Sequence, residues 1–105
     1  MTMSSLESEF NDAMLGIYKS ALKECNYRAT AFLGMVVEHG GVQTAKRLLS
    51  TSVMQSGLYE LFECGRLDLT VETLVLQPEY QGLFEPEELA EAKKRIEELQ
   101  SKSKL

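Results

Sequence analysis

Apolar residues at helical spacing constrain the fold of this chain more than any other feature of its sequence. In the first 25 residues they recur every three or four positions, which gives a helix one apolar face and one charged face. The stripe consists of Leu6, Phe10, Ala13, Met14, Ile17, Ala21, Leu22 and Cys25. Ser4 and Glu7 have the spacing of a capping box, in which each side chain bonds the backbone N–H of the other residue. The pattern predicts a first helix from about Leu6 to Glu24.

Two adjacent glycines predict a tight turn after the second helix. Asn26 and Thr30 are both possible caps for this helix, which is expected to end at His39. Gly40 and Gly41 follow directly, and glycine adopts positive φ at no steric cost. We therefore expect the chain to reverse here and start a new helix at once.

Short helices are expected on both sides of a polar segment in the middle of the chain. The third helix is predicted over Val42 to Ser50, with Lys46 and Arg47 facing outward. Residues 50–57 are rich in serine and threonine, and we interpret them as a surface loop and not as a domain boundary. A fourth helix should follow and end at Gly65.

Residues Leu67 to Leu76 fit two patterns. Their alternation of apolar and polar residues is typical of a strand, yet the same residues also form a helix face. A lone strand leaves its backbone hydrogen-bonding groups unpaired, and no second strand is predicted elsewhere, so we favour a helix. Asp68 or Thr70 could cap it, and Pro78 should end the segment.

The last helix has a well-marked start. Glu85 lies at the cap and Pro86 at the first helical position, where a missing N–H costs nothing. Its apolar stripe consists of Leu89, Ala92, Ile96 and Leu99. Its solvent-exposed faces are predicted to carry the pairs Glu91/Arg95, Lys93/Glu97 and Lys94/Glu98. Residues 1–4 and 101–105 are expected to fray. The chain is thus predicted to be one all-α domain over 1–105, with five to six short helices in orthogonal or bundle-like packing.

The charge of the chain is concentrated in its second half. The 105 residues have a net charge of −5. Residues 1–57 carry five basic and five acidic side chains, whereas residues 58–105 carry six basic and eleven acidic ones. A phosphate backbone needs clustered Lys and Arg, so nucleic acid is possible only on the first half and is not favoured. No apolar run approaches the roughly 20 residues of a membrane helix, and no secretory leader is recognisable. We therefore expect an acidic cytoplasmic protein.

The residues that could carry enzyme or metal chemistry are few and widely spaced. Cys25, His39 and Cys64 lack the short spacings of zinc ligands. The cysteines are interpreted as small buried hydrophobes, and His39 as a favourable residue at a helix C-terminus. A Cys/His dyad would use the same three residues, but no glycine-rich turn follows a strand to build an oxyanion hole. We predict no catalytic residue, no metal and no cofactor.

A helix-turn-helix is the alternative interpretation of the first half. The two helices around the glycine pair have its outline, and the second would present Gln43, Thr44, Lys46 and Arg47 to DNA. The detailed pattern fits less well, because Lys46 or Arg47 falls where a buried β-branched residue is usual. An αα-hairpin alone is common to most helical domains.

Protein interaction is the remaining class of function. The last helix has a narrow apolar seam that could face a partner helix, and five methionines suit adaptable apolar contacts. The region from Gly57 to Arg66 offers a second candidate surface. Its contact residues are predicted to be Tyr59, Glu60, Glu63 and Arg66. Arg66 could also pair with Asp68 across a turn.

Most of residues 26–99 resembles a group of small uncharacterised bacterial proteins. The resemblance is carried by the segment GRLDLTVETLVL at 65–76, by Pro78-Glu79-Tyr80 after it, and by 32–49 around the glycine pair. It implies a bacterial or phage origin and a compact helical domain, and it brings no activity and no functional residue. We therefore predict a non-enzymatic interaction or regulatory module that binds a protein partner or a second copy of itself.

Overall fold

Helices form wherever apolar residues recur at helical spacing along this chain. The computed structural model describes residues 5–51 and 56–103. Over these two ranges the fold is all-α, with six α-helices, two 3₁₀ helices and no β-strand. The elements are α1 (Ser5–Cys25), α2 (Thr30–His39), α3 (Gly41–Ser50), α4 (Ser56–Glu63), η1 (Leu67–Leu69), α5 (Val71–Val75), η2 (Pro78–Leu83) and α6 (Pro86–Ser103). The predicted fold class is confirmed.

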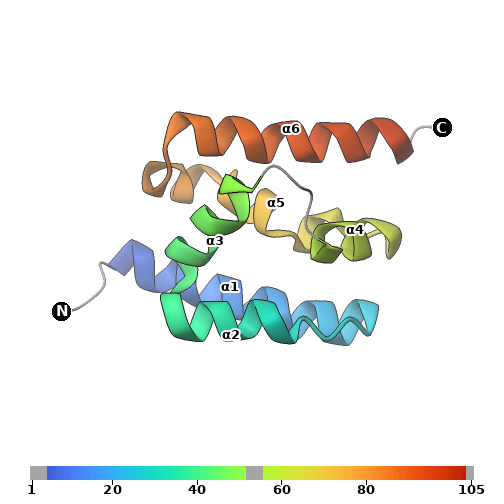
Figure 1. The fold of residues 1–105 in the computed structure, drawn as a ribbon, viewed down its shortest axis with the longest axis horizontal. Helices are drawn as coiled ribbons and strands as arrows, with labels where there is room; N and C mark the ends of the chain where they lie inside the picture. Colours follow the sequence, from blue (N-terminus) through green and yellow to red (C-terminus); the bar gives the residue numbers. More distant parts are fainter. Residues whose placement is uncertain (1–4, 52–55, 104–105) are drawn as a thin grey trace.

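The long helices lie at two edges of the molecule, and the short ones fill the space between them. Figure 1 shows α1 and α2 side by side along one edge and α6 along the opposite edge. α3 crosses between them and contacts α1, α2, α5 and α6. α4 lies at the end of the molecule where α1 terminates. This arrangement places α3 in the interior and leaves α4 at the periphery.

The main core joins α1, α2, α3, α5 and α6. Phe10 and Met14 of α1 are fully buried in it, and the Phe10 ring packs edge-on against Tyr80 and Phe84 with centroids 5.1 and 5.3 Å apart. Edge-to-face packing of this kind stabilises aromatic clusters beyond the area that they bury. The cluster consists of Phe10, Met14, Val36, Ala45, Leu49, Val71, Val75, Phe84 and Ala92. None of the described side chains of α4 belongs to it.

The glycine pair between α2 and α3 serves two different purposes. Gly40 has φ +85°, which is the left-handed backbone expected at a helix end. Gly41 is the first residue of α3, and a Cβ there would lie 2.9 Å from the Cα of Asn11. Its N–H donates a hydrogen bond to Asn11 Oδ1 at 2.8 Å. Gly40 therefore turns the chain, while Gly41 allows α3 to start against α1 and be capped by it.

The predicted helix at 67–76 forms as two pieces. η1 is followed by α5, and Thr70 lies between them as the N-cap, since its hydroxyl accepts the Thr73 N–H. Thr70 is thus the cap, and the other candidate, Asp68, has a different partner. Pro78 does not simply end the segment, because it opens η2, an element that the sequence did not predict.

The start of α6 follows the prediction. Pro86 is its first residue, and the backbone N–H of Glu85 donates to Glu88 Oε1 at 2.8 Å, which is the capping arrangement of a helix N-terminus. α6 continues to Ser103 and so includes residues 101–103, where fraying is predicted. The fraying expected at 1–4 and 104–105 and the cap predicted at Ser4 lie outside the described residues.

The loop predicted at 50–57 overlaps the ends of two helices. Ser50 is the last residue of α3, and residues 56 and 57 already belong to α4. Thr51 has no helical assignment, and residues 52–55 lie outside the described part.

Candidate functional site

A small apolar cavity lies between the peripheral helix α4 and the rest of the fold. Its volume is about 150 Å³. α1, α2 and α4 each contribute side chains to it. Those used below are Ile17, Ala21, Phe32, Met35, Leu58 and Leu61. A cavity of this size and lining accommodates a group of about the size of a benzene ring.

The sequence of α4 explains why a cavity is left beneath it. Leu58 and Leu61 are 4% and 5% exposed and point inward, but they line the cavity and are absent from the main core cluster. Gly57, at the start of α4, also lines the cavity, and a Cβ there would lie 3.4 Å from the Tyr27 hydroxyl. α4 therefore forms one wall of the cavity.

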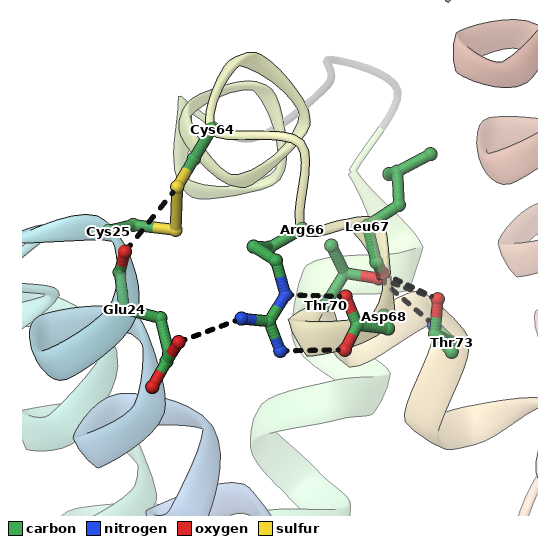
Figure 2. Close-up of polar contacts among 8 residues, drawn as sticks. All are labelled: Glu24, Cys25, Cys64, Arg66, Leu67, Asp68, Thr70 and Thr73. Atoms are coloured by element: carbon green, nitrogen blue, oxygen red, sulfur yellow. Dashed lines mark hydrogen bonds and ion pairs between the residues drawn. A yellow bond between two sulfur atoms is a disulfide. The ribbon is translucent and has the colours of Figure 1, made fainter.

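Two helices that end in the same way bring the cysteines together. Asn26, directly after Cys25, has φ +53°, and Gly65, directly after Cys64, has φ +79°. The residue after each left-handed residue donates its N–H back to the helix, from Tyr27 to Ala21 O and from Arg66 to Leu61 O. These ends place the cysteine Cα atoms 5.9 Å apart, and the two sulfurs form a disulfide (Figure 2). The bridge fixes the C-terminal end of α4 to the C-terminal end of α1.

The interpretation of the cysteines as buried hydrophobes is therefore wrong. Cys64 is exposed and Cys25 half-buried, and both sulfurs are consumed by the bridge. Cys64 Sγ lies 3.8 Å from the carbonyl oxygen of Glu24, but a bridged sulfur has no proton to donate. In this form neither cysteine is a free thiol that His39, the last residue of α2, could activate as a nucleophile.

Arg66 connects the same two helix ends through charge. Its guanidinium donates two hydrogen bonds to the carboxylate of Asp68, at 3.0 and 3.1 Å, and a third to Glu24 at 3.0 Å (Figure 2). The hydrogen bonds from Arg66 hold the pKa of Asp68 below its ordinary value. The predicted Arg66–Asp68 pair is present, and it extends to α1 through Glu24.

A hydroxyl cluster stabilises the start of α5 beneath this pair. The carbonyl oxygen of Leu67 accepts hydrogen bonds from the hydroxyls of Thr70 and Thr73, both at 2.8 Å (Figure 2). Thr70 is 1% exposed and also lines the cavity. The Thr70 side chain at the cavity is thus held in place by its hydrogen bonds to Leu67 and Thr73.

A buried ion pair between Glu72 and Arg95 adjoins the cavity. Glu72 lines the cavity, and its carboxylate accepts a hydrogen bond at 3.1 Å from Arg95 of α6, with both side chains 4% exposed. Arg95 also donates to the carbonyls of Leu48 and Thr51, at 3.1 and 2.6 Å, and to Glu91 at 2.7 Å. It thereby satisfies the carbonyl end of α3, where a cation is favoured.

Placing Arg95 on a solvent-exposed face of the last helix is therefore wrong. The buried residues of α6 are Ala92, Arg95 and Leu99, while Leu89 and Ile96 are only partly buried. The buried face is rotated from the predicted stripe because carbonyl and carboxylate acceptors of α3 and α5 face Arg95. Glu91 and Arg95 do form the predicted pair at 2.7 Å.

The predicted contact residues Tyr59, Glu60 and Glu63 lie together on the outer face of α4. All three are exposed, and the Tyr59 ring packs edge-on against Phe62 with centroids 5.9 Å apart. The ammonium of Lys102 lies 6.0 Å from the same ring. Arg66, the fourth member, is directed toward Glu24 and Asp68 and does not join this face.

The residues of the alternative DNA surface are not assembled on one face. Thr44, expected to be exposed, is wholly buried because α3 is packed on several sides. Lys46, expected to face outward, pairs with Glu88 at 2.8 Å and lies 5.4 Å from the Phe84 ring centroid. Gln43 and Arg47 are exposed. Of the four proposed contact residues, Thr44 is thus buried and Lys46 is already paired within the fold.

Comparisons with known proteins leave the site to be interpreted from its own geometry. No family model, no curated protein and no solved structure matches this chain. The resemblance to small bacterial proteins stays a prediction. Within 5–51 and 56–103, no helix has the length and apolar content needed to span a membrane, and no three His, Cys, Asp or Glu side chains are grouped to hold a metal ion.

Proposed function

We propose that this chain is a non-enzymatic protein-interaction module that binds a segment of a protein partner in the cavity between α1, α2 and α4. The observation that carries the proposal is the cavity itself, which is apolar and walled by a helix outside the main core. Burial of one apolar side chain at the centre of an interface commonly supplies much of the binding free energy. The bound residue would be an apolar side chain of the partner.

The acidic side chains near the cavity favour a partner whose apolar residue has basic neighbours. Glu60 and Glu63 are exposed on α4, and Glu60 lies one turn from Gly57, a cavity-lining residue. Residues 58–105 carry the whole excess of acidic side chains. Complementary charge increases the association rate and selects partners, so a partner segment with Lys or Arg beside its apolar residue fits best.

A regulatory role in the cytoplasm is part of the proposal. The cytoplasm keeps most thiols reduced, and disulfides that form there are usually transient. In that compartment the Cys25–Cys64 bridge would be reversible and not a permanent structural link. DNA binding by α3 is not proposed further, because Thr44 and Lys46 have other roles in the fold.

The proposal is tested by filling the cavity. Ala21 is 1% exposed and lines it, so Ala21→Leu places three more carbons in the space that the partner side chain would occupy. Peptides selected from a random display library on the oxidised chain should share an apolar residue flanked by Lys or Arg. Their affinity, measured by fluorescence anisotropy, should fall at least tenfold in Ala21→Leu, since a buried side chain contributes roughly 1.5–3 kcal/mol.

Ala90→Leu is the matched control, because Ala90 is exposed on α6 and away from the cavity. It should leave peptide affinity unchanged. Equal binding by wild type and Ala21→Leu, or failure to select any peptide, would contradict the proposal. The mass of the chain in solution tests whether the partner is a second copy of the chain. A wild-type dimer that becomes a monomer in Ala21→Leu would identify a second copy as the partner.

A further inference from the structure

We infer that the Cys25–Cys64 disulfide is a reducible latch, and that thiol–disulfide exchange at Cys64 Sγ releases α4 and dismantles the binding cavity. The inference rests on the proposed function and adds the regulation of the same site. The reactant is a dithiol, either a small molecule or a dithiol protein. The oxidised chain is the binding form and the reduced chain the released form.

Accessibility selects the sulfur that reacts. Cys64 is exposed on the segment after α4, whereas Cys25 is half-buried at the end of α1. Exchange requires an attacking thiolate to reach the sulfur along the S–S axis. The geometry therefore favours attack on Cys64, with Cys25 as the leaving group.

The exchange balances as two steps. One thiolate of the dithiol attacks Cys64 Sγ, a mixed disulfide forms, and the electron pair of the broken bond leaves on Cys25 Sγ, which takes a proton from water. The second thiol of the reagent, as its thiolate, then attacks the reagent sulfur of the mixed disulfide and expels Cys64 Sγ, which is also protonated. Two electrons and two protons pass to the protein, and the dithiol becomes a disulfide.

Among the described residues, the contacts that remain to α4 once the bridge is open include the packing of Leu58 and Leu61 over the cavity, a Lys102 ammonium 6.0 Å from the Tyr59 ring, and one exposed ion pair. Among the described residues, the Arg66–Glu24 ion pair is the other polar side-chain link between the ends of α4 and α1, and its partners are 36% and 41% exposed. Exposed ion pairs contribute little to stability. Leu58 and Leu61 line a cavity instead of interlocking with the main core. The main core keeps its contacts, because the cluster around Phe10 and Met14 contains no described residue of α4.

Loss of α4 removes one wall of the cavity. Leu58 and Leu61 supply that wall, and a partner side chain cannot be enclosed without them. The apparent affinity of a ligand falls in proportion to the fraction of the protein that is binding-competent. Peptide affinity should therefore drop at least tenfold on reduction with dithiothreitol and recover on reoxidation.

Hydrogen exchange tests the latch without any ligand. On reduction, the amides of residues 61–66 should lose protection at least tenfold, while amides of α3 and α6 should keep theirs. The Cys25→Ser/Cys64→Ser variant should match the reduced wild type in both hydrogen exchange and affinity. Glu24→Gln, which removes the neighbouring ion pair and leaves the bridge, should match the oxidised wild type.

Glutathione identifies the reactive sulfur. Treatment of the oxidised chain with glutathione, followed by alkylation and peptide mass mapping, should place the mixed disulfide on Cys64 and the alkyl group on Cys25. An adduct mainly on Cys25 would refute the assigned direction of attack. A bridge that opens only in denaturant would refute the latch.

The outcomes separate the latch from the proposed function. If selected peptides bind oxidised and reduced protein equally and residues 61–66 stay protected, the latch is wrong and the binding function stands. If no peptide binds either form but protection of α4 responds to reduction, the binding function is wrong and the latch stands. Circular dichroism of the reduced chain checks that the helices outside α4 persist.

Discussion

Arg95 is buried on α6 and forms hydrogen bonds with α5, with the end of α3 and with its own helix. Its guanidinium hydrogen bonds reach Glu72 of α5, two carbonyls at the end of α3, and Glu91 on its own helix. Taking a charge out of water is costly, and this arrangement compensates the cost with several hydrogen bonds. The side chain thus fixes the end of α3 relative to α5 and α6.

Removal of Arg95 should strongly destabilise the fold. Arg95→Met leaves the Glu72 carboxylate buried without its cation, and the free energy of unfolding should fall by about 3–5 kcal/mol. Urea denaturation at pH 7 measures the change. The double variant Arg95→Met/Glu72→Met should recover much of the loss, because no charge is then left buried. Arg47→Met, at an exposed position of α3, should have little effect, and a similar loss there would contradict the interpretation.

Thr44 is a residue whose replacement should stabilise the chain. Its hydroxyl is fully buried and has no hydrogen-bond partner among the described residues. Thr44→Val has nearly the same shape without the unsatisfied oxygen, so the free energy of unfolding should rise by about 1 kcal/mol. Thermal denaturation provides the measurement.

Thr73→Val is the matched control for Thr44→Val. The Thr73 hydroxyl donates to Leu67 O at 2.8 Å, so the same substitution should lower the free energy of unfolding by about 1–2 kcal/mol. Changes of the same sign in both variants would show that burial of the methyl group decides the outcome, and not the hydrogen bond.

At the scale of the elements, the carboxylate of Glu88 caps the start of α6 and links it to α3. Glu88 accepts the Glu85 N–H and also pairs with Lys46 of α3. Burial alone raises the pKa of Glu88, but the Lys46 ammonium and the Glu85 N–H outweigh it and lower the pKa below the ordinary value. Because the folded pKa is lowered, the contribution of Glu88 is complete above the ordinary pKa of Glu and is lost as the pH falls through the folded pKa.

Glu88→Gln should therefore change the pH dependence of stability. At pH 7 the free energy of unfolding should fall by about 1 kcal/mol, since both a cap and a partly exposed ion pair are weakened. The difference from wild type should shrink as the pH drops below the ordinary Glu pKa. Chemical denaturation from pH 3 to 7 measures this. Glu87→Gln, at the exposed neighbouring position, should keep the wild-type profile, and a constant difference at all pH values for Glu88→Gln would contradict the assignment.

The helices were predictable to the extent that local sequence determines them. Periodicity located α1, α2, α3, α4 and α6, and residues 67–76 were assigned as helix although their alternation also fits a strand. The break at Thr70 and the 3₁₀ helix after Pro78 were missed, because each depends on a few hydrogen bonds and not on a repeat. The site was less accessible to prediction. The burial of Arg95 depends on acceptors more than 20 residues away, and periodicity carries no information about them.

The disulfide was missed for a related reason. The two cysteines are 39 residues apart, and only the complete fold brings the ends of α1 and α4 together. A local signal was nevertheless present, because each cysteine directly precedes a residue suited to a left-handed helix end, Asn26 or Gly65. Two cysteines at two helix ends are a pattern that sequence analysis could examine.

For the whole molecule, the bridge encloses α2, α3 and α4 in one covalent loop. Closing a loop of about 40 residues lowers the entropy of the unfolded chain, which corresponds to about 4 kcal/mol in the chain-entropy description. Cys25→Ser/Cys64→Ser should reduce the free energy of unfolding by about 3–4 kcal/mol in urea denaturation. Reduced wild type should show the same value, and a change below about 1 kcal/mol would show that the unfolded chain is little constrained.

The same loop changes how the molecule would respond to force applied at its two ends. Tension passes along α1 to Cys25, crosses the sulfur–sulfur bond and continues from Cys64 into α5 and α6, so the segment between the cysteines carries no load. An extended chain spans about 3.3–3.6 Å per residue. Once unfolded and fully extended in an optical trap, the oxidised protein is therefore shorter than the reduced protein by about 130 Å, a length that reports the state of one bond in a single molecule.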